Sequence, residues 1–164
     1  MTETMNWGIL GGSKFALEHM APAINAARAS RFAALATSNV ARGAEFSAIA
    51  SGLVLHESYE ALLADPSIDV VYIPLPNHLH VEWTLKAVAA GKHVLTEKPI
   101  AMQAHEIDQL IKARDASGKL VAEAYMIVHH PQWERARALV RSGAIGTVEH
   151  VDANFSYDNR TDRD

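Results

Sequence analysis

Residues 69–80, DVVYIPLPNHLH, and residues 93–99, HVLTEKP, share one layout, in which a short apolar run ends at a polar loop that contains proline. The apolar runs are rich in β-branched residues, which favours strands buried on both faces of a parallel sheet. In an open sheet of this kind, ligands bind at the carboxyl ends of the strands. The two loops therefore place an amide, two histidines, a carboxylate and a lysine where a ligand would lie: Asn77, His78, His80, Glu97 and Lys98.

Short β-branched runs alternate with helical segments along the chain, which predicts βαβ units and a doubly wound parallel α/β sheet. Pro22 interrupts the first helical segment, so we expect two short helices there, with Pro22 in the first turn of the second. The expected strands are residues 6–10, 31–37, 53–56, 70–73, 93–96 and 120–125, followed by a long strand at 147–157. The other expected helices are residues 40–50, 59–64, 78–90, 104–116 and 131–142.

The composition is that of an ordinary globular domain, with 49% apolar and 21% charged residues in a chain of 164. The formal net charge of -4 gives no electrostatic footprint for nucleic acid. No cysteine is present, which removes disulfides and thiolate metal sites and fits a reducing cytoplasm. The first residues lack the layout of a signal peptide, and no apolar run approaches the roughly 20 residues of a membrane helix. We therefore expect a cytoplasmic protein that binds neither nucleic acid nor membrane.

The sequence GILGGSKFA, residues 8–16, lies between the first expected strand and the first helix, as a dinucleotide fingerprint does. In the G-x-G-x-x-G/A frame, Gly11 takes the first glycine position, Ser13 the second and Ala16 the third. A serine narrows the approach of the pyrophosphate but offers a hydroxyl donor, and the amides at the helix start supply the rest. The alternative is a plain strand-to-helix turn. The residues predicted to hold the phosphates are Gly11, Gly12, Ser13, Lys14 and Phe15.

The end of the second expected strand distinguishes NADP from NAD. NAD sites usually carry Asp or Glu there to bind the ribose hydroxyls. This chain has Thr37, Ser38 and Asn39 instead, with Arg42 just beyond, so donors and a positive charge stand where a carboxylate would repel a 2′-phosphate. We expect NADP to be preferred over NAD. The alternative is that Arg42 is simply a solvated helix residue.

The histidines and the lysine of the two loops each allow a functional and a structural interpretation. His78 and His80 are two positions apart and do not share a helix face, which argues against a metal pair, and we expect no metal site. Lys98 follows a buried strand and precedes Pro99, which biases it away from a helix. There its ammonium can stabilise an alkoxide or polarise a carbonyl. The alternative is a weak surface pair between Lys98 and Glu97.

The strand-end motifs, Pro76-Asn77-His78-Leu79-His80 and Glu97-Lys98-Pro99, resemble the signature of the glucose-fructose oxidoreductase/inositol dehydrogenase family. The resemblance implies hydride transfer between NADP(H) or NAD(H) and a sugar, polyol or cyclic diol. It also implies that Lys98 acts on the substrate hydroxyl as the catalytic residue. The resemblance also implies cofactor contacts outside the turn at residues 11–15 and the end of the second strand. These residues are Leu75, Pro76, Asn77, His80, Glu97 and Lys98.

Members of this family are about twice as long and carry a second, sheet-based substrate domain. The resemblance therefore implies a dinucleotide-binding domain at residues 1–122 and the beginning of an α+β substrate domain at residues 123–164. It implies that Tyr125, His129 and His130 line the sugar site, although a His-His pair at a helix start is equally often structural. The family's second catalytic residue has no counterpart here, and assembly into a homo-oligomer is expected through the second domain.

Two other classes of function remain open at this point. A non-catalytic nucleotide-binding or redox-sensing module would keep the phosphate turn without needing Lys98 near the nicotinamide. A lyase or hydrolase that retains NAD throughout its cycle would bind the cofactor tightly and show no net redox change.

Overall fold

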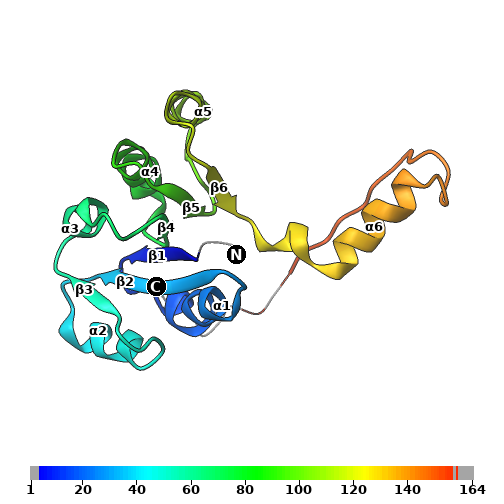
Figure 1. Ribbon diagram of the computed structural model, residues 1–164. Helices are drawn as coiled ribbons and strands as arrows, with labels where there is room; N and C mark the ends of the chain where they lie inside the picture. The colour runs from blue at the N-terminus through cyan, green and yellow to red at the C-terminus, as the bar shows by residue number, and fades with distance from the viewer. Residues whose placement is uncertain (1–3, 157, 159–164) are drawn as a thin grey trace. The chain divides into compact units, whose positions relative to one another are not determined.

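The computed structural model describes residues 4–156 and 158 of the chain. Its sheet has six strands in the order β3-β2-β1-β4-β5-β6, and every neighbouring pair is parallel (Figure 1). The strands are β1 (Met5–Leu10), β2 (Ser30–Ala36), β3 (Val54–His56), β4 (Val70–Ile73), β5 (His93–Glu97) and β6 (Val121–Ala124). The predicted doubly wound α/β fold is confirmed.

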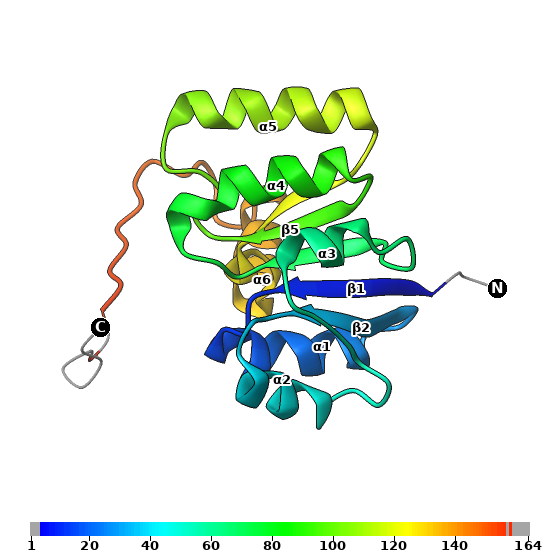
Figure 2. The same cartoon turned by 90° about the vertical axis from the view of Figure 1, so that its left-hand side faces the viewer.

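Helices cover both faces of this sheet, as Figure 2 shows, with α1 and α2 on one face and α3, α4 and α5 on the other. Their bounds are α1 (Ala21–Ala26), α2 (Val40–Ser47), α3 (Tyr59–Ala64), α4 (His80–Ala89) and α5 (Ala104–Ser117). Alternate strand residues face opposite layers, because successive side chains of a strand point to opposite faces. Ile9 and Tyr72 belong to the core under α1 and α2, whereas Leu10 and Val71 belong to the core under α3 and α4.

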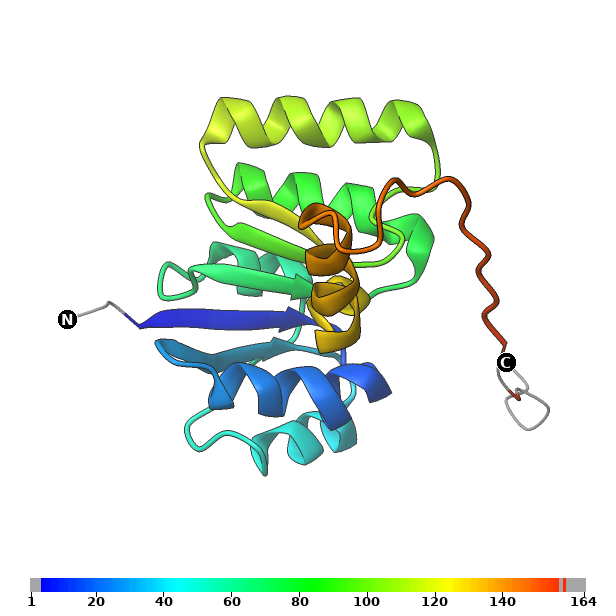
Figure 3. The same cartoon turned by 90° about the vertical axis from the view of Figure 1, so that its right-hand side faces the viewer.

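The carboxyl ends of all the strands lie at the same edge of the sheet, and the arrowheads in Figure 3 point to it. The chain leaves β1 toward β2 on one side and reaches β4 on the other, so the direction of winding changes between β1 and β4. Ligands of open α/β sheets bind at such a switch point. The loops that the sequence singled out for the cofactor and for Lys98 follow β1, β2, β4 or β5, and so they lie at this edge.

The first helical segment differs from the prediction of two separate short helices. The backbone stays helical from residue 14 to residue 26, and the stretch Ala16–Met20 is π-helical. Pro22 does lie in the first turn of α1, as expected. Because Pro22 has no amide to donate, the wider π turn accommodates it without ending the helix.

A second compact unit begins at Met126, whereas residues up to Tyr125 form the first. The second unit contains a 3₁₀ turn (Met126–His129) and α6 (Pro131–Arg141). The prediction of a long strand at 147–157 is wrong for residues 147–156, which form no strand, and Tyr157 lies outside the described residues. A strand must satisfy its backbone groups on a neighbouring strand, and an alternating pattern alone does not supply that partner.

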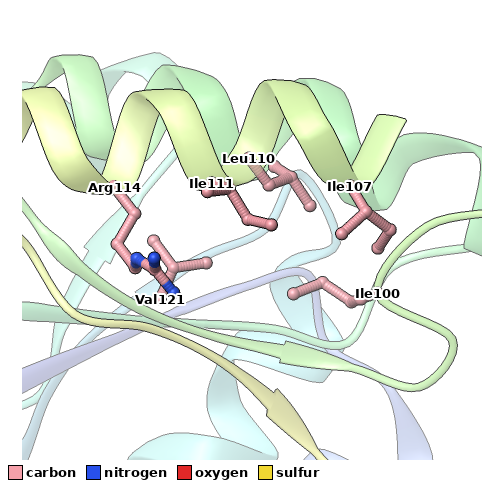
Figure 4. A pocket seen from close by; sticks show the side chains of 6 residues that line it. All are labelled: Ile100, Ile107, Leu110, Ile111, Arg114 and Val121. Atoms are coloured by element: carbon pink, nitrogen blue, oxygen red, sulfur yellow. The ribbon is translucent and has the colours of Figure 1, made fainter. Parts of the chain in front are cut away.

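An apolar groove of about 150 Å³ lies between α5 and the edge strand β6 (Figure 4). Its walls are Ile100, Ile107, Leu110, Ile111, Arg114 and Val121. None of these is a predicted site residue, and Arg114 contributes the one charged group, so the groove is not the site that the strand-end loops form. Among the described residues, no helix combines the length and the apolar character that crossing a membrane requires.

Candidate functional site

The turn between β1 and the first helix has a backbone suited to close contact with a ligand. Gly11 has a φ of +84°, which glycine adopts without strain, and its amide donates to the carbonyl of Ala36 at 2.9 Å. A Cβ atom added at Gly11 would lie 2.9 Å from Leu75 Cδ2, and one at Gly12 would overlap the side chain of Arg42. The two glycines therefore let side chains from the loop after β4 and from α2 pack directly against the turn.

Ser13 ends this turn and caps the helix that follows. Its Oγ accepts a hydrogen bond from the amide of Ala16 at 3.1 Å, which is an N-cap contact. The hydroxyl proton remains for another acceptor, and the amides of Lys14 and Phe15 fall in the first turn, where helices have no internal acceptor. This arrangement fits a bound pyrophosphate, and phosphate binding by residues 11–15 stays a prediction.

Ser13→Ala is expected to weaken the binding of NADP and NAD alike, by about 0.5–3 kcal/mol, because both cofactors share the pyrophosphate. Calorimetric titration measures both affinities, and thermal unfolding measures the separate cost of the lost cap. Ser13→Gly is the matched variant, since it supplies the usual glycine backbone without a hydroxyl. A gain with Ser13→Gly and no loss with Ser13→Ala would show that the hydroxyl does not touch the pyrophosphate.

Residues 37–42, which follow β2, form a tight turn held by side-chain hydrogen bonds and lie next to the turn at Gly12. Thr37 Oγ1 accepts from the amide of Asn39 at 3.2 Å, and Asn39 Oδ1 accepts from the amide of Arg42 at 3.0 Å. The hydroxyl of Thr37 and the amide group of Asn39 keep protons to donate, and Ser38 is exposed. Arg42 Nη1 lies 2.7 Å from Glu45 Oε2, a pairing that the sequence analysis missed.

The loop after β4 lies beside the turn at Gly11. Leu75 is buried and packs against Gly11, while Pro76 and Asn77 are exposed and Asn77 begins a 3₁₀ turn, Asn77–Leu79. Tyr59, from α3, also reaches Gly11, and burial raises the pKa of its hydroxyl above the ordinary value. Sequence reasoning missed Tyr59, since nothing in its spacing connects α3 with this turn.

The loop after β5 carries Lys98 on a supported backbone. The peptide bond between Lys98 and Pro99 is cis. The amide of Ile100 donates to Glu123 at 2.9 Å, and Glu106 accepts from the amides of Met102 and Gln103 in the capping box of α5. The loop is therefore held after Lys98 by these hydrogen bonds, and the side chain of Lys98 is exposed at the carboxyl edge of the sheet.

Glu97 is engaged by neighbours other than the Lys98 ammonium. Tyr72 Oη donates to Glu97 Oε1 at 2.8 Å, and the amide of Lys98 donates to Glu97 Oε2 at 3.2 Å. Burial, followed by this hydrogen bond to a carboxylate, raises the pKa of Tyr72 far above its ordinary value, so the hydroxyl stays a donor. In residues 4–156 and 158 no ion pair of Lys98 is found, so the surface-pair alternative has no support.

His80 lies beneath the edge rather than on it. Its side chain is fully buried at the start of α4, and both ring nitrogens lie 2.7 Å from main-chain carbonyl oxygens, those of Pro99 and Leu75. Neither ring nitrogen is left to contact a cofactor. A direct contact of the His80 ring nitrogens with a cofactor, as the family resemblance implies, is therefore not supported by this geometry, and the cofactor role of His80 stays a prediction.

The three residues predicted at the sugar site fall at the boundary between the two compact units. Tyr125 is half exposed at the end of the first unit, and His129 and His130 belong to the second, which begins at Met126. His130 Nδ1 accepts from the amide of Gln132 at 3.2 Å and caps α6, which matches the structural alternative for the pair. Across residues 4–156 and 158, no three His, Asp or Glu side chains gather as metal ligands would.

The carboxyl edge of the sheet therefore presents a different kind of polar group after each strand from β2 to β5. Donors and one guanidinium stand after β2, main-chain amides and a hydroxyl after β1, and an amide side chain and an ammonium after β4 and β5. This order matches a molecule with a phosphate in the middle, a second anionic group at one end and a reacting, oxygen-bearing centre at the other.

Comparison with known proteins identifies the family of the chain. Residues 5–125 match the model of the oxidoreductase family with the NAD-binding Rossmann fold. A D-xylose 1-dehydrogenase (NADP(+)) of Haloferax volcanii is 42% identical over 93% of this chain and 46% of its own length. A dTDP-3,4-didehydro-2,6-dideoxy-α-D-glucose 3-reductase of Streptomyces violaceoruber is 39% identical over 94% of this chain and 45% of its own length.

A solved structure shares the fold. The crystal structure of KijD10, a 3-ketoreductase from Actinomadura kijaniata, in complex with NADP and TDP-benzene aligns with a TM-score of 0.80 and 33% identity. The alignment covers 86% of this chain and 43% of that one, and the chain spans about half the length of the curated relatives it matches. The family expected from the strand-end motifs is confirmed, and the chain belongs to the oxidoreductase family with the NAD-binding Rossmann fold.

Proposed function

We propose that this chain is the cofactor-binding half of an NAD(P)-dependent oxidoreductase that transfers a hydride between nicotinamide and a sugar, polyol or cyclic diol. The observation that carries the proposal is the exposed ammonium of Lys98, which stands without an ion pair in the described chain, on a supported loop two strands away from the phosphate turn. A lysine that served only as a solvated surface residue would need neither a hydrogen-bonded loop nor a position at the carboxyl end of β5.

The strand order gives the direction in which the dinucleotide would lie. The pyrophosphate would meet the amides after Gly11, and the adenosine ribose would meet Thr37, Ser38 and Asn39 at the end of β2. The nicotinamide would then extend the other way, over Asn77 and Lys98 at the ends of β4 and β5. Leu75 and Arg42 pack against Gly11 and Gly12 and so bring the loop after β4 and the start of α2 next to this turn, which supports this fit.

In this placement the cofactor supplies the hydride chemistry and the protein manages charge. Lys98 would donate to the substrate oxygen as negative charge develops there, which stabilises an alkoxide or polarises a carbonyl. Tyr72 and the amide of Lys98 hold the carboxylate of Glu97, so that carboxylate does not draw the ammonium away.

The relatives support the substrate class. Two of them are named for a dehydrogenase of D-xylose and a reductase of a nucleotide-linked keto sugar. Cyclic diols remain part of the proposal on the strength of the strand-end motifs. We also propose a cytoplasmic location and a homo-oligomer formed through the second, C-terminal domain.

NADP is proposed as the preferred cofactor, and Arg42→Ala tests the preference. The substitution is expected to weaken NADP binding by about 1.5–3 kcal/mol, the usual worth of a hydrogen bond to a charged group, and to leave NAD binding nearly unchanged. Glu45 competes for the same guanidinium at 2.7 Å, so Glu45→Gln is expected to shift affinity in the opposite direction. Equal or tighter binding of NAD by the unaltered protein, measured by calorimetry, would refute the preference.

The reaction itself is tested by incubating the full-length protein with aldoses, polyols and cyclic diols while the absorbance of the reduced nicotinamide is followed. Turnover of at least one sugar or polyol with NADP or NAD is expected. Tightly retained cofactor with substrate conversion but no net change in absorbance would identify the NAD-retaining lyase or hydrolase instead. Cofactor binding without conversion of any substrate would identify the redox-sensing module.

A further inference from the structure

Helix α3 lies close to β1 because two glycines at that strand leave room for its side chains. A Cβ atom added at Gly8 would lie 2.7 Å from Leu62 Cδ2, and one added at Gly11 would lie 3.2 Å from Tyr59 Oη. Tyr59 and Leu62 are three positions apart, so they share one face of the helix. This face therefore brings the Tyr59 hydroxyl to the carboxyl end of β1, beside the turn at Gly11.

The ring of Tyr59 is oriented by its surroundings. Trp83 of α4 is only 7% exposed, and its ring meets the Tyr59 ring edge to face, with the centroids 4.9 Å apart and the planes at 89°. Aromatic pairs favour this geometry. Ser58 Oγ accepts from the amide of Ala61 at 3.1 Å and so caps the helical turn that carries Tyr59. Packing and the cap therefore aim the hydroxyl without a hydrogen bond of its own.

The Tyr59 hydroxyl has no partner in the part of the chain that the structure describes. No hydrogen bond of Tyr59 Oη is found there, and the one fully buried side-chain nitrogen or oxygen without a partner is Trp7 Nε1. The hydroxyl therefore reaches open space beside Gly11. Burial raises the pKa of Tyr59, so the hydroxyl keeps its proton and can donate. A phenylalanine would pack against Trp83 equally well, so packing does not account for the hydroxyl.

The neighbours of this hydroxyl favour a ligand rich in oxygen atoms. The turn that begins at Gly11 supplies further donors, namely the free amides of the first helical turn and the hydroxyl of Ser13. The amide of Gly11 bonds to Ala36, the last residue of β2, so the Tyr59 hydroxyl lies near the β2 side of the edge. Lys98 follows β5, which is two strands away from β1 on the other side. The hydroxyl thus lies where the adenosine and its phosphate are proposed to bind.

We propose that Tyr59 is a cofactor-binding residue whose hydroxyl donates a hydrogen bond to an oxygen of the adenosine-phosphate half of the dinucleotide. This inference rests on the proposed function and adds a contact from α3, which lies outside the strand-end loops. NAD and NADP share this half of the molecule. The contact is therefore expected to strengthen the binding of both cofactors and to leave the preference between them unchanged.

Tyr59→Phe tests the contact, because it removes the hydroxyl and keeps the ring. Calorimetric titration is expected to show about tenfold weaker binding of NADP, of NAD and of adenosine 2′,5′-bisphosphate, which carries no nicotinamide. The thermal unfolding temperature of the unliganded protein is expected to stay unchanged, since the substitution removes no hydrogen bond from it. A purely structural tyrosine would not give this combination.

Thr84→Val is the matched control, because it also removes one hydroxyl from a side chain that packs inside the domain. Thr84 is fully buried in α4, and its Oγ1 lies 2.6 Å from Thr96 Oγ1. The expected pattern is the reverse of that for Tyr59→Phe. The unfolding temperature falls because a buried hydrogen bond is lost, and the three affinities stay unchanged.

The possible outcomes separate the contact from the function on which it rests. If Tyr59→Phe binds all three ligands as tightly as the unaltered protein, the contact is wrong and the proposed function stands. A loss for NADP and NAD without a loss for the bisphosphate would also overturn it, because the hydroxyl would then serve the nicotinamide half. An unfolding temperature that falls as far as in Thr84→Val would make the hydroxyl a structural group. If the unaltered protein binds none of the three ligands, the proposed function fails, and the contact fails with it.

Discussion

Lys98→Met in the full-length protein is expected to lower kcat by about 10²-fold or more, with little change in the affinity for NADP. Losses of this size are typical when a group that transfers a proton or stabilises developing charge is removed. Methionine keeps most of the length and apolar character of the side chain, so the loop held by Glu123 and Glu106 is retained. Steady-state rates with the best substrate, together with calorimetric titration of NADP, measure the two quantities.

Lys112→Met is the matched control for this substitution. Lys112 is exposed on α5, away from the carboxyl ends of the strands, and its loss is expected to leave kcat unchanged. A kcat for Lys98→Met that stays within a few-fold of the unaltered protein would remove Lys98 from the mechanism. A parallel loss in Lys112→Met would indicate a general effect of removing positive charge.

Gly11→Ala is expected to weaken NADP and NAD binding together by roughly 2–5 kcal/mol. A positive φ costs a residue with a Cβ about 1–2 kcal/mol, and overpacking costs about 1–3 kcal/mol more. The new methyl group would lie 2.9 Å from Leu75 Cδ2 and 3.2 Å from Tyr59 Oη. The turn relieves this strain by changing shape in the unbound protein, so that cofactor binding must restore the strained form.

Gly52→Ala separates strain from crowding. Gly52 has a φ of +78° but no neighbouring atom within 4 Å, and it precedes β3 at the opposite end of the strands. Its substitution is expected to lower thermal stability and to leave cofactor affinity unchanged. Calorimetric affinities for Gly11→Ala that match those of Gly52→Ala would show that the turn at Gly11 does not hold the cofactor.

The sequence predicted the sheet and the loops well because both depend on short-range patterns. Strand β4 is buried throughout, as its continuous apolar run requires, and β5 ends at Glu97, beside the loop that carries Lys98. Ser58 and Gly118 mark the start of α3 and the end of α5, as capping preferences lead one to expect. Parallel pairing then brings loops distant in sequence to one edge.

The features that sequence reasoning missed depend on contacts between distant residues. The bond between Tyr72 and Glu97 spans 25 positions, and the pair of carbonyls around His80 comes from two separate loops. Lys92 is buried and donates to the carbonyls of Asp65 and Ile68, and burial lowers its pKa, although no local pattern distinguishes it from an exposed lysine. The strand wrongly predicted at 147–156 is the opposite case. Its alternating pattern is a local feature, but a strand also needs a partner strand that is distant in sequence.

A crystal structure of the full-length protein with NADP tests the central claim most directly, because it measures where each end of the cofactor lies. We predict the pyrophosphate at the amides after Gly11, the 2′-phosphate at Arg42, and the nicotinamide at the ends of β4 and β5, with its ring beside Lys98. A dinucleotide bound elsewhere, or one whose nicotinamide points away from Lys98, would contradict the account.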